Sequence, residues 1–202
     1  FIETITPLNS SIKGGTSEIK TRYYVDDGPV MDKAWAVKSG VGWMGKHTNV
    51  INPEYGSWLF LSEIITNLEF ETYDEPIEDL CGSCRICIDA CPTGAIIDEY
   101  KLDSNLCISY QTIENHGEIP ENIELHGWVF GCDICQDVCP FNKNDRPVSD
   151  KDFYPKPEIY NKPLSELDNI TEQQFKELFT DSPIRRTKYK GWKRNLQKNI
   201  LN

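Results

Sequence analysis

Eight cysteines with two related spacings are the residues of this chain best suited to chemistry. The first group follows the C-x-x-C-x-x-C-x-x-x-C-P pattern of bacterial ferredoxins and consists of Cys81, Cys84, Cys87 and Cys91. The second group lacks the leading cysteine of that pattern and consists of Cys132, Cys135 and Cys139. Only Cys107 remains to complete it. These spacings predict two [4Fe–4S] clusters that use all eight thiolates.

The ferredoxin pattern also predicts which cysteines share a cluster. In that pattern the fourth cysteine of a run ligates the other cluster. A proline follows both Cys91 and Cys139 and turns the chain away at each place. One cluster is therefore assigned to Cys81, Cys84, Cys87 and Cys139. The other cluster is assigned to Cys91, Cys107, Cys132 and Cys135.

Other uses of paired cysteines fit the spacing less well. Zinc sites also use C-x-x-C pairs, but they need neither a third cysteine at the next x-x spacing nor C-x-x-x-C-P. Disulfides need an oxidising compartment, and C-x-x-C spacing repeated this often makes a poor disulfide framework. Two linked clusters would conduct electrons. A plain ferredoxin has no need of residues 108–131 between Cys107 and Cys132, and this segment could cover a cluster or shape a pocket.

Short elements are expected upstream of the cysteines. Residues 23–25 are typical of a strand, and Pro29 suits the first turn of a helix that ends at Gly40. Residues 50–51 and 58–61 are expected to be strands on either side of a turn at residues 52–56.

Gly40, Gly42 and Gly45 match the letters of the G-x-G-x-x-G dinucleotide motif. That motif requires a strand before it and a helix after it, whereas here a predicted helix precedes it. We expect instead a glycine-rich turn that approaches a bulky neighbour closely, with Trp43 in a packing role. The histidines are scattered, and surface or turn roles are expected for His47, His116 and His126.

The chain is acidic overall but basic at its C-terminal end. Its net charge of −11 argues against indiscriminate nucleic-acid binding. Seven of the 21 basic residues fall between positions 184 and 202, where no acidic residue occurs. Thr171 and Gln174 have capping-box spacing for a helix before this stretch. Trp192, Leu196 and Ile200 recur at helical spacing and are expected to pack the basic helix down.

The remaining sequence bounds the class of protein. The 39% of hydrophobic residues can bury an ordinary core, and no stretch approaches the roughly 18 to 20 apolar residues of a membrane span. No signal peptide is visible. Because the chain begins at Phe1 and not at Met, we interpret it as a fragment of a longer protein. A cytoplasmic monomer without membrane contact is expected.

Several motifs, in order along the chain, resemble the epoxyqueuosine reductase family from about residue 23 to residue 199. They are Val25-Asp26-Asp27-Gly28-Pro29, Gly40-Val41-Gly42-Trp43-Met44-Gly45-Lys46, Asn52-Pro53-Glu54-Tyr55-Gly56-Ser57-Trp58, Cys107-Ile108-Ser109-Tyr110, Phe130-Gly131-Cys132-Asp133, Cys135-Gln136, Val138-Cys139-Pro140, Ser182-Pro183-Ile184-Arg185-Arg186 and Lys193-Arg194-Asn195.

The resemblance implies an oxidoreductase that reduces epoxyqueuosine in tRNA to queuosine with cobalamin and two [4Fe–4S] clusters. It implies an α+β fold in three parts. Residues 1–75 would be the C-terminal part of a nitroreductase-like cobalamin-binding domain. Residues 76–145 would be a bacterial ferredoxin-like domain with two clusters, and residues 146–202 a linker with a basic helical segment. Because side chains supply no low-potential electrons, an external electron donor is expected.

The resemblance also implies roles for individual residues. Asp26 matches the acid that would protonate the departing epoxide oxygen. Cobalamin contacts are expected from Asp26, Ser109, Asp133 and Ile134. Phosphates of the tRNA anticodon stem–loop are expected to bind Arg185, Arg186, Lys188, Lys193 and Arg194. Without the resemblance, each of these residues has a simpler alternative role. Asp26 or Asp27 could cap a helix, and Ser109 and Asp133 could form local hydrogen bonds with the backbone. The basic segment could be a solvated helix.

Two other functions fit part of the sequence. A reductive dehalogenase-like enzyme would use the same cofactors on a small organohalide, but the basic tail and the missing export signal argue against it. A ferredoxin-type electron-transfer module would need neither residues 23–68 nor residues 108–131. Binding of cobalamin would separate the module from the two enzymes, and binding of tRNA would separate the enzymes from each other.

Overall fold

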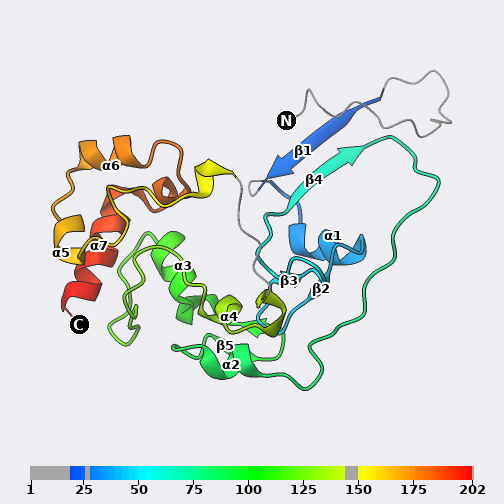
Figure 1. Ribbon diagram of the computed structural model, residues 1–202, viewed down its shortest axis with the longest axis horizontal. Coiled ribbons are helices and arrows are strands. Elements are labelled where there is room, and N and C mark those ends of the chain that lie inside the picture. Colours follow the sequence, from blue (N-terminus) through cyan, green and yellow to red (C-terminus); the bar gives the residue numbers. More distant parts are fainter. Residues whose placement is uncertain (1–18, 26–27, 144–149, 202) are drawn as a thin grey trace.

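The computed structural model describes residues 19–25, 28–143 and 150–201, which form short helices and small antiparallel sheets (Figure 1). The strand pairs are β1 (Thr21–Val25) with β4 (Ser62–Thr66), β2 (Trp43–Met44) with β3 (Val50–Ile51), and β5 (Ile96–Asp98) with β6 (Lys101–Leu102). The described part of the chain therefore mixes helices and sheets, as an α+β class requires.

Most helices are short. The α-helices are α1 (Asp32–Lys38), α2 (Ile86–Ala90), α3 (Ile108–Ile113), α4 (Ile134–Asp137), α5 (Leu164–Leu167), α6 (Glu172–Leu178) and α7 (Lys188–Leu201). The 3-10 helices are η2 (Ser104–Leu106), η3 (Pro140–Asn142), η4 (Lys151–Phe153) and η5 (Pro183–Thr187). None of the helices within the described ranges is long and apolar enough to cross a lipid bilayer. In Figure 1 the β1–β4 ribbon and the helices α5 to α7 lie on opposite sides, with α2, α3 and α4 between them.

Helix α1 begins later than the sequence predicted. Its N-cap is Met31 and its first residue is Asp32, so the helix does not open at Pro29. The N-cap of α1 is Met31, and Asp26 and Asp27, the caps considered from the sequence, lie outside the described residues. The end of the helix is confirmed, because Gly40 follows Lys38 after one residue and has a φ of +71°.

The glycine-rich turn leads into the β2–β3 hairpin. A Cβ atom on Gly42 would lie 2.2 Å from the carbonyl oxygen of Ile51, and one on Gly45 would lie 2.6 Å from Cδ1 of the same residue. The bulky neighbour is therefore Ile51 in β3, and the strand–turn–helix order of a dinucleotide site is absent here. Trp43 is 2% exposed and packs edge-on against Phe141, with ring centroids 4.8 Å apart.

The strand expected at residues 58–61 is wrong. The ladder with β1 begins only at Ser62, which pairs with Val25. Before it, the N–H of Leu59 donates to the carbonyl of Ser57 at 2.9 Å and tightens the chain into a turn. The preceding turn is confirmed, because Asn52 Oδ1 accepts two backbone N–H groups at 2.8 and 3.0 Å.

Three hydrophobic clusters hold the described chain together. The first joins α5, α6 and α7 and contains Leu167, Phe175, Phe179, Trp192 and Leu196. The second lies in α3 and the segment after it and contains Ile108, Ile119, Ile123 and Leu125. The third ties the β2–β3 hairpin to the cysteine region through Trp43, Ile51 and Cys139. The segment of residues 108–131 therefore has a core of its own.

The C-terminal helices follow the sequence closely, with one exception. Thr171 and Gln174 form the capping box at the start of α6, as predicted. Trp192 is 3% exposed and Leu196 is fully buried, so both pack α7 down. Ile200 is 47% exposed, and its expected packing role is wrong because the last turn of α7 extends beyond the cluster.

Candidate redox site

Four of the cysteines gather where α2 and η3 approach each other. Cys81 and Cys84 lie in the loop before α2, Cys87 lies within α2, and Cys139 lies directly before η3. Burial raises the pKa of the Cys87 thiol, and the charges of Cys139, Cys81 and Cys84 raise this pKa further. The structure thus brings together the set that the sequence assigned to one cluster.

The other four cysteines meet between α2, α3 and α4. Cys91 follows α2, Cys107 precedes α3, Cys132 precedes α4, and Cys135 lies within α4. Burial first, and then the neighbouring thiols, raise the pKa of Cys135 to about 12. A thiol with this pKa is protonated in neutral water, and a bound positively charged metal centre would favour the thiolate of Cys135.

The cysteines do not suit a single metal ion or a disulfide as they are placed. All eight lie in the described ranges and are free thiols. Within those ranges, no three His, Cys, Asp or Glu side chains lie close enough together to hold one metal ion. A zinc ion draws four sulfurs to about 2.3 Å from one centre, whereas a cubane of four irons spreads them more widely. The donor set therefore fits an iron–sulfur cluster better.

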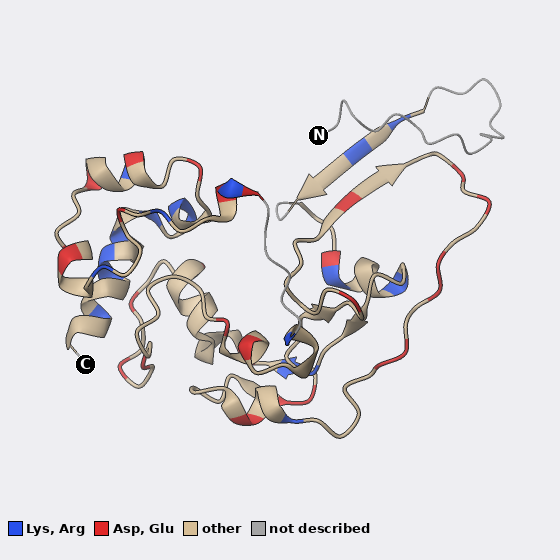
Figure 2. Cartoon of the chain, in the orientation of Figure 1, with Lys and Arg blue, Asp and Glu red and all other residues tan. Residues whose placement is uncertain are grey.

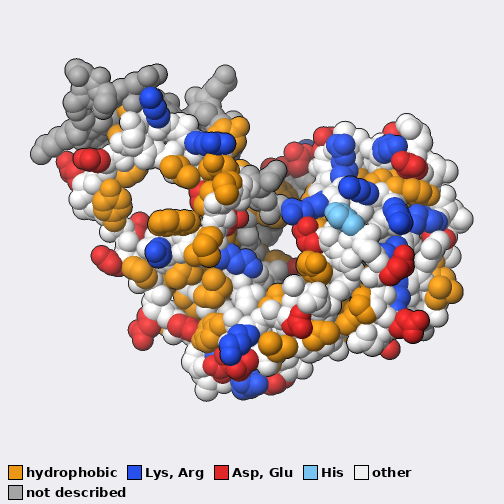
Figure 3. All heavy atoms as spheres, turned by 180° about the vertical axis from the view of Figure 1, so that it is seen from behind, with side chains coloured by type: hydrophobic (Ala, Val, Ile, Leu, Met, Phe, Trp, Pro, Cys, Tyr) orange, Lys and Arg blue, Asp and Glu red, His pale blue; other side chains and the backbone are white. Residues whose placement is uncertain are grey.

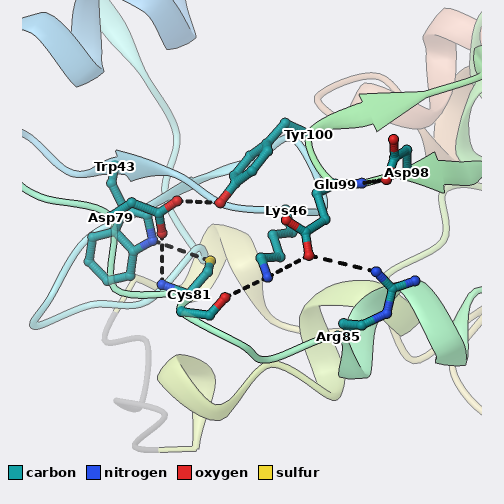
Figure 4. A network of polar contacts seen from close by, with 9 residues as sticks. Trp43, Lys46, Asp79, Cys81, Arg85, Asp98, Glu99 and Tyr100 are labelled. Carbon is teal, nitrogen blue, oxygen red and sulfur yellow. Dashed lines mark hydrogen bonds and ion pairs between the residues drawn. The ribbon is translucent and has the colours of Figure 1, made fainter.

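Trp43 and Asp79 flank Cys81 in the first cysteine set (Figure 4). The indole Nε1–H of Trp43 donates to Cys81 Sγ at 3.5 Å, and the N–H of Cys81 donates to Asp79 Oδ1 at 2.7 Å. The hydroxyl of Tyr100 donates to the other oxygen of the same carboxylate. Trp43 was expected only to pack, and this hydrogen bond from β2 to a cysteine sulfur is an additional contact.

An ion pair between buried Lys46 and the partly exposed Glu99 supports the loop between Cys81 and Cys84. Lys46 is 3% exposed, and its Nζ donates to the carbonyl of Gly82 at 2.6 Å and to Glu99 Oε1 at 2.8 Å. Arg85 approaches the same carboxylate oxygen at 3.6 Å, as Figure 4 shows. Lys46, in the glycine-rich turn, therefore anchors a cluster-binding loop 36 residues away in the chain.

A cavity of about 340 Å³ opens beside the second cysteine set. All four of its cysteines line the cavity, and so do Ser109, Asp133 and Ile134, the residues for which cobalamin contacts were expected. Burial raises the pKa of Asp133, whose Oδ1 accepts a hydrogen bond from Gln136 Nε2 at 2.9 Å. Residues of α3 also line the cavity, so the segment after Cys107 does shape a pocket.

His47 is a cavity residue that the sequence did not reveal. It lies in a turn, as expected, but it is 3% exposed, so the surface alternative is wrong. Burial and the charge of Lys33 lower its pKa to about 4, and its Nδ1 accepts the N–H of Asn49 at 3.2 Å. The neutral ring therefore carries its proton on Nε2, which has no hydrogen-bond partner among the described residues. A donor of this kind suits a bound ligand that offers an oxygen acceptor.

Asp26, the expected acid, lies outside the described residues. The chain on either side is described, with β1 ending at Val25 and the chain resuming at Gly28 before α1. Lys33 of α1 lines the same cavity as Ser109 and Asp133. The segment that contains Asp26 therefore joins two described elements, one of which contributes to the cavity.

Basic residues gather on α7 and η5, whereas acidic residues follow the long segment between β4 and α2 (Figure 2). The space-filling view from behind shows the same gathering of Lys and Arg over the C-terminal helices (Figure 3). Within it, Arg185 donates to the carbonyl of Thr180 at 2.9 Å, and Lys193 forms an ion pair with Asp168. Lys188 is exposed at the start of α7.

Arg194 does not serve as the phosphate contact that was expected. Its guanidinium donates to the carbonyls of Gln111 at 2.7 Å, of Asn115 at 2.6 Å and of Gly117. These carbonyls lie at the end of α3 and just beyond it, so Arg194 fastens α7 to the wall of the cavity. Because its donors are used by backbone oxygens, Arg194 is better described as structural.

Arg194→Met should therefore destabilise the protein and leave tRNA binding unchanged. Hydrogen bonds to a charged group contribute about 1.5 to 3 kcal/mol each, so the loss of three should lower the melting temperature by about 10 °C or more. Thermal unfolding of the anaerobic holoprotein would measure this, with Lys190→Met as a matched loss of charge on α7. A large loss of tRNA affinity with an unchanged melting temperature would restore Arg194 to the phosphate-binding set.

Comparison with known proteins agrees with this geometry. Residues 80–142 match the family described as a 4Fe-4S double cluster binding domain, so the site is that of a two-cluster iron–sulfur protein. An epoxyqueuosine reductase of Synechocystis sp. is 47% identical over 197 residues, which cover 96% of this chain and 68% of that protein. The chain belongs to the epoxyqueuosine reductase family.

Further relatives support the same assignment. The epoxyqueuosine reductase of Cellulophaga algicola is 46% identical over 94% of this chain and 62% of its own length. A solved epoxyqueuosine reductase with an epoxyqueuosine-modified stem–loop of tRNA-Tyr has a TM-score of 0.85 at 38% identity, covering 92% of this chain and 49% of its own. The Bacillus subtilis structure has a TM-score of 0.83 at 37% identity, covering 91% of this chain and 48% of its own. The chain thus spans about half the length of the solved relatives.

Proposed function

We propose that this chain is the cluster-bearing part of an epoxyqueuosine reductase, which reduces the epoxide of epoxyqueuosine in tRNA to queuosine as the last step of queuosine synthesis. The observation that carries the proposal is the cavity that the second cysteine set shares with Ser109 and Asp133. The cysteines of this cavity could hold a cluster that supplies electrons, and the polar side chains of Ser109 and Asp133 could bind a ligand beside it. The relatives of the same name, one solved with a modified tRNA stem–loop, support the substrate.

The cofactors follow from the donor sets. When bound, two [4Fe–4S] clusters and cobalamin would supply the low-potential electrons that side chains lack. One cluster would be held by Cys81, Cys84, Cys87 and Cys139, and the other by Cys91, Cys107, Cys132 and Cys135. Ser109, Asp133 and Ile134 would bind the cobalamin, and the unpartnered Nε2–H of His47 makes the cavity suitable for a ligand with amide oxygens.

The proton for the departing oxygen is assigned to Asp26. Opening an epoxide by reduction leaves an oxygen that must be protonated, and a carboxylic acid beside the substrate can donate to it. The Bacillus subtilis relative has a catalytic loop, named for an aspartate, swung out of its active site, which supports an aspartate in this role. Asp26 would also contact the corrin.

The roles proposed for the three parts of the chain follow those of the family. Residues 1–75 would complete a nitroreductase-like cobalamin domain, residues 76–145 would form the ferredoxin-like domain, and residues 146–202 would form the linker and the basic segment. Arg185, Arg186, Lys188 and Lys193 would bind phosphates of the anticodon stem–loop, without Arg194. An external donor would deliver the electrons to a cytoplasmic, monomeric protein.

The proposal is tested by turnover on its substrate. Anaerobic holoprotein with cobalamin, a reductant and tRNA that carries epoxyqueuosine should yield queuosine, detected by the mass of the released nucleoside as a loss of one oxygen. A plain electron-transfer module would leave the corrin spectrum unshifted and the nucleoside unchanged. A dehalogenase-like enzyme would shift the corrin spectrum but turn over only an organohalide. Either result would overturn the proposal.

Binding of tRNA should depend on the exposed charge at Lys188. Lys188→Glu should weaken binding about tenfold at low salt and reduce the dependence of affinity on salt concentration, because a phosphate contact becomes a repulsion. Gel shifts across a salt titration would measure both. Lys176→Glu is the matched control, because Lys176 lies on α6 and pairs with Glu172. Equal losses in the two variants would indicate only a general effect of net charge.

A further inference from the structure

The two cysteine sets differ in the charges that surround them. Near Cys81, cations and anions are balanced: Lys46 and Arg85 share the carboxylate of Glu99, and Asp79 accepts the N–H of Cys81. Charges paired in this way largely cancel when seen from the metal site. The first set therefore has little net charge from its neighbours.

The second set faces a cation with no carboxylate partner in the described ranges. Lys33 of α1 lines the cavity together with Cys91, Cys107, Cys132 and Cys135. Its Nζ donates only to neutral oxygens, the carbonyl of Thr48 at 2.8 Å and Asn49 Oδ1 at 3.1 Å. Desolvation lowers the pKa of Lys33, while the charges of Cys135 and Cys107 raise it, so the ammonium lies within electrostatic reach of two ligands.

The other ionisable residues of this cavity have partners of their own or carry no charge. Asp133 accepts a hydrogen bond from Gln136 Nε2 at 2.9 Å. Glu114 is held by Arg186, with Nε and Oε1 2.9 Å apart. His47 is neutral because its pKa lies at about 4. Among the described residues that line the cavity, Lys33 is the one Lys or Arg.

The loop whose Thr48 carbonyl accepts the hydrogen bond from Lys33 is in a strained conformation. Thr48 has a φ of +66°, a region that β-branched residues rarely adopt, and its N–H donates to the carbonyl of Gly45 at 2.8 Å. This conformation presents the Thr48 carbonyl to the ammonium. Strain of this kind persists where the surrounding structure needs it, and here it fixes a charge beside the cysteines.

We propose that Lys33 tunes the cluster of Cys91, Cys107, Cys132 and Cys135 to a higher reduction potential, so that electrons arriving at the other cluster pass toward the cavity. One-electron reduction by an external donor adds one negative charge to the cluster, and a fixed ammonium stabilises that reduced form more than the oxidised one. Lys33 acts through the cluster and does not touch the substrate. The inference rests on the two clusters of the proposed function.

Potentiometry of the holoprotein tests this role. In Lys33→Met, the equilibrium constant for reducing the second cluster should fall about tenfold, which is ~59 mV toward negative potential for one electron. An anaerobic dithionite titration followed by electron paramagnetic resonance would measure the shift, with signals assigned from Cys107→Ala, which should keep only the first cluster. Lys33→Arg should retain the wild-type potential. Lys38→Met is the matched control, because Lys38 lies over the ring of Trp35 and not in the cavity.

The possible outcomes separate the two proposals. Wild-type protein without acid-labile sulfide would overturn the proposed function itself. Two loaded clusters with an unchanged second potential in Lys33→Met would overturn only the tuning role. Loss of iron from Lys33→Met would make Lys33 a structural residue and would also overturn the tuning role. A shift of equal size in Lys38→Met would show that the effect is not specific to this site.

Discussion

Asp26→Ala is expected to abolish epoxide reduction while both clusters remain in place. Without a proton donor, the epoxide oxygen must be released from the ring as an unprotonated alkoxide, and general acid catalysis typically contributes about 10²- to 10⁴-fold. All eight cysteines lie at least 55 positions further along the chain, so cluster assembly should be unaffected. Turnover of tRNA-bound epoxyqueuosine, measured beside the visible absorbance of the clusters, would check both parts.

Asp27→Ala is the matched control for this change. Both aspartates are acidic, they are neighbours in the chain, and the N-cap of α1 is Met31. Full turnover by Asp26→Ala would remove Asp26 from the mechanism, and loss of turnover in Asp27→Ala alone would move the role there.

Features that depend on neighbouring residues could be predicted from the sequence. The capping box at Thr171, the turn at Asn52 and the helix end at Gly40 each involve contacts within a few positions, and the structure confirms them. The juxtaposition of the cysteine sets could also be predicted, because the ferredoxin spacing carries a known exchange of ligands. A cysteine spacing can predict contacts between distant parts of the chain only because the cluster fixes the positions of its four ligands.

Features that depend on distant packing could not be predicted. His47 was expected at a surface or in a turn, but it is 3% exposed and lines the cavity beside the second cysteine set, which is built from segments far away in the chain. Arg194 belonged to a basic run typical of phosphate binding, yet its carbonyl partners lie 77 to 83 residues away. The prediction of a strand at residues 58–61 was wrong because a strand needs a pairing partner, and the residues that pair with β1 begin only at Ser62.

Cys107→Ala is expected to remove the second cluster and stop turnover. Cys107 is the only cysteine outside the two compact groups, and it lines the cavity beside Cys132 and Cys135. Its loss leaves three thiolates for that cluster, and the electron path to the cavity would be interrupted. Iron and acid-labile sulfide per chain should fall by about half, as measured on anaerobically purified protein. Ser109→Ala, two positions away on the same wall, should keep its full iron content.

Pairs of substitutions test the exchange of ligands more sharply. Cys91 lies only four positions after Cys87, but Cys91 lines the cavity together with Cys107, Cys132 and Cys135, whereas Cys87 does not. Cys91→Ala combined with Cys107→Ala should therefore lose no more iron than either change alone, because both act on one cluster. Cys91→Ala combined with Cys139→Ala should lose nearly all of it. The reverse pattern would show that each run of cysteines holds its own cluster, and the electron path would then need a different description.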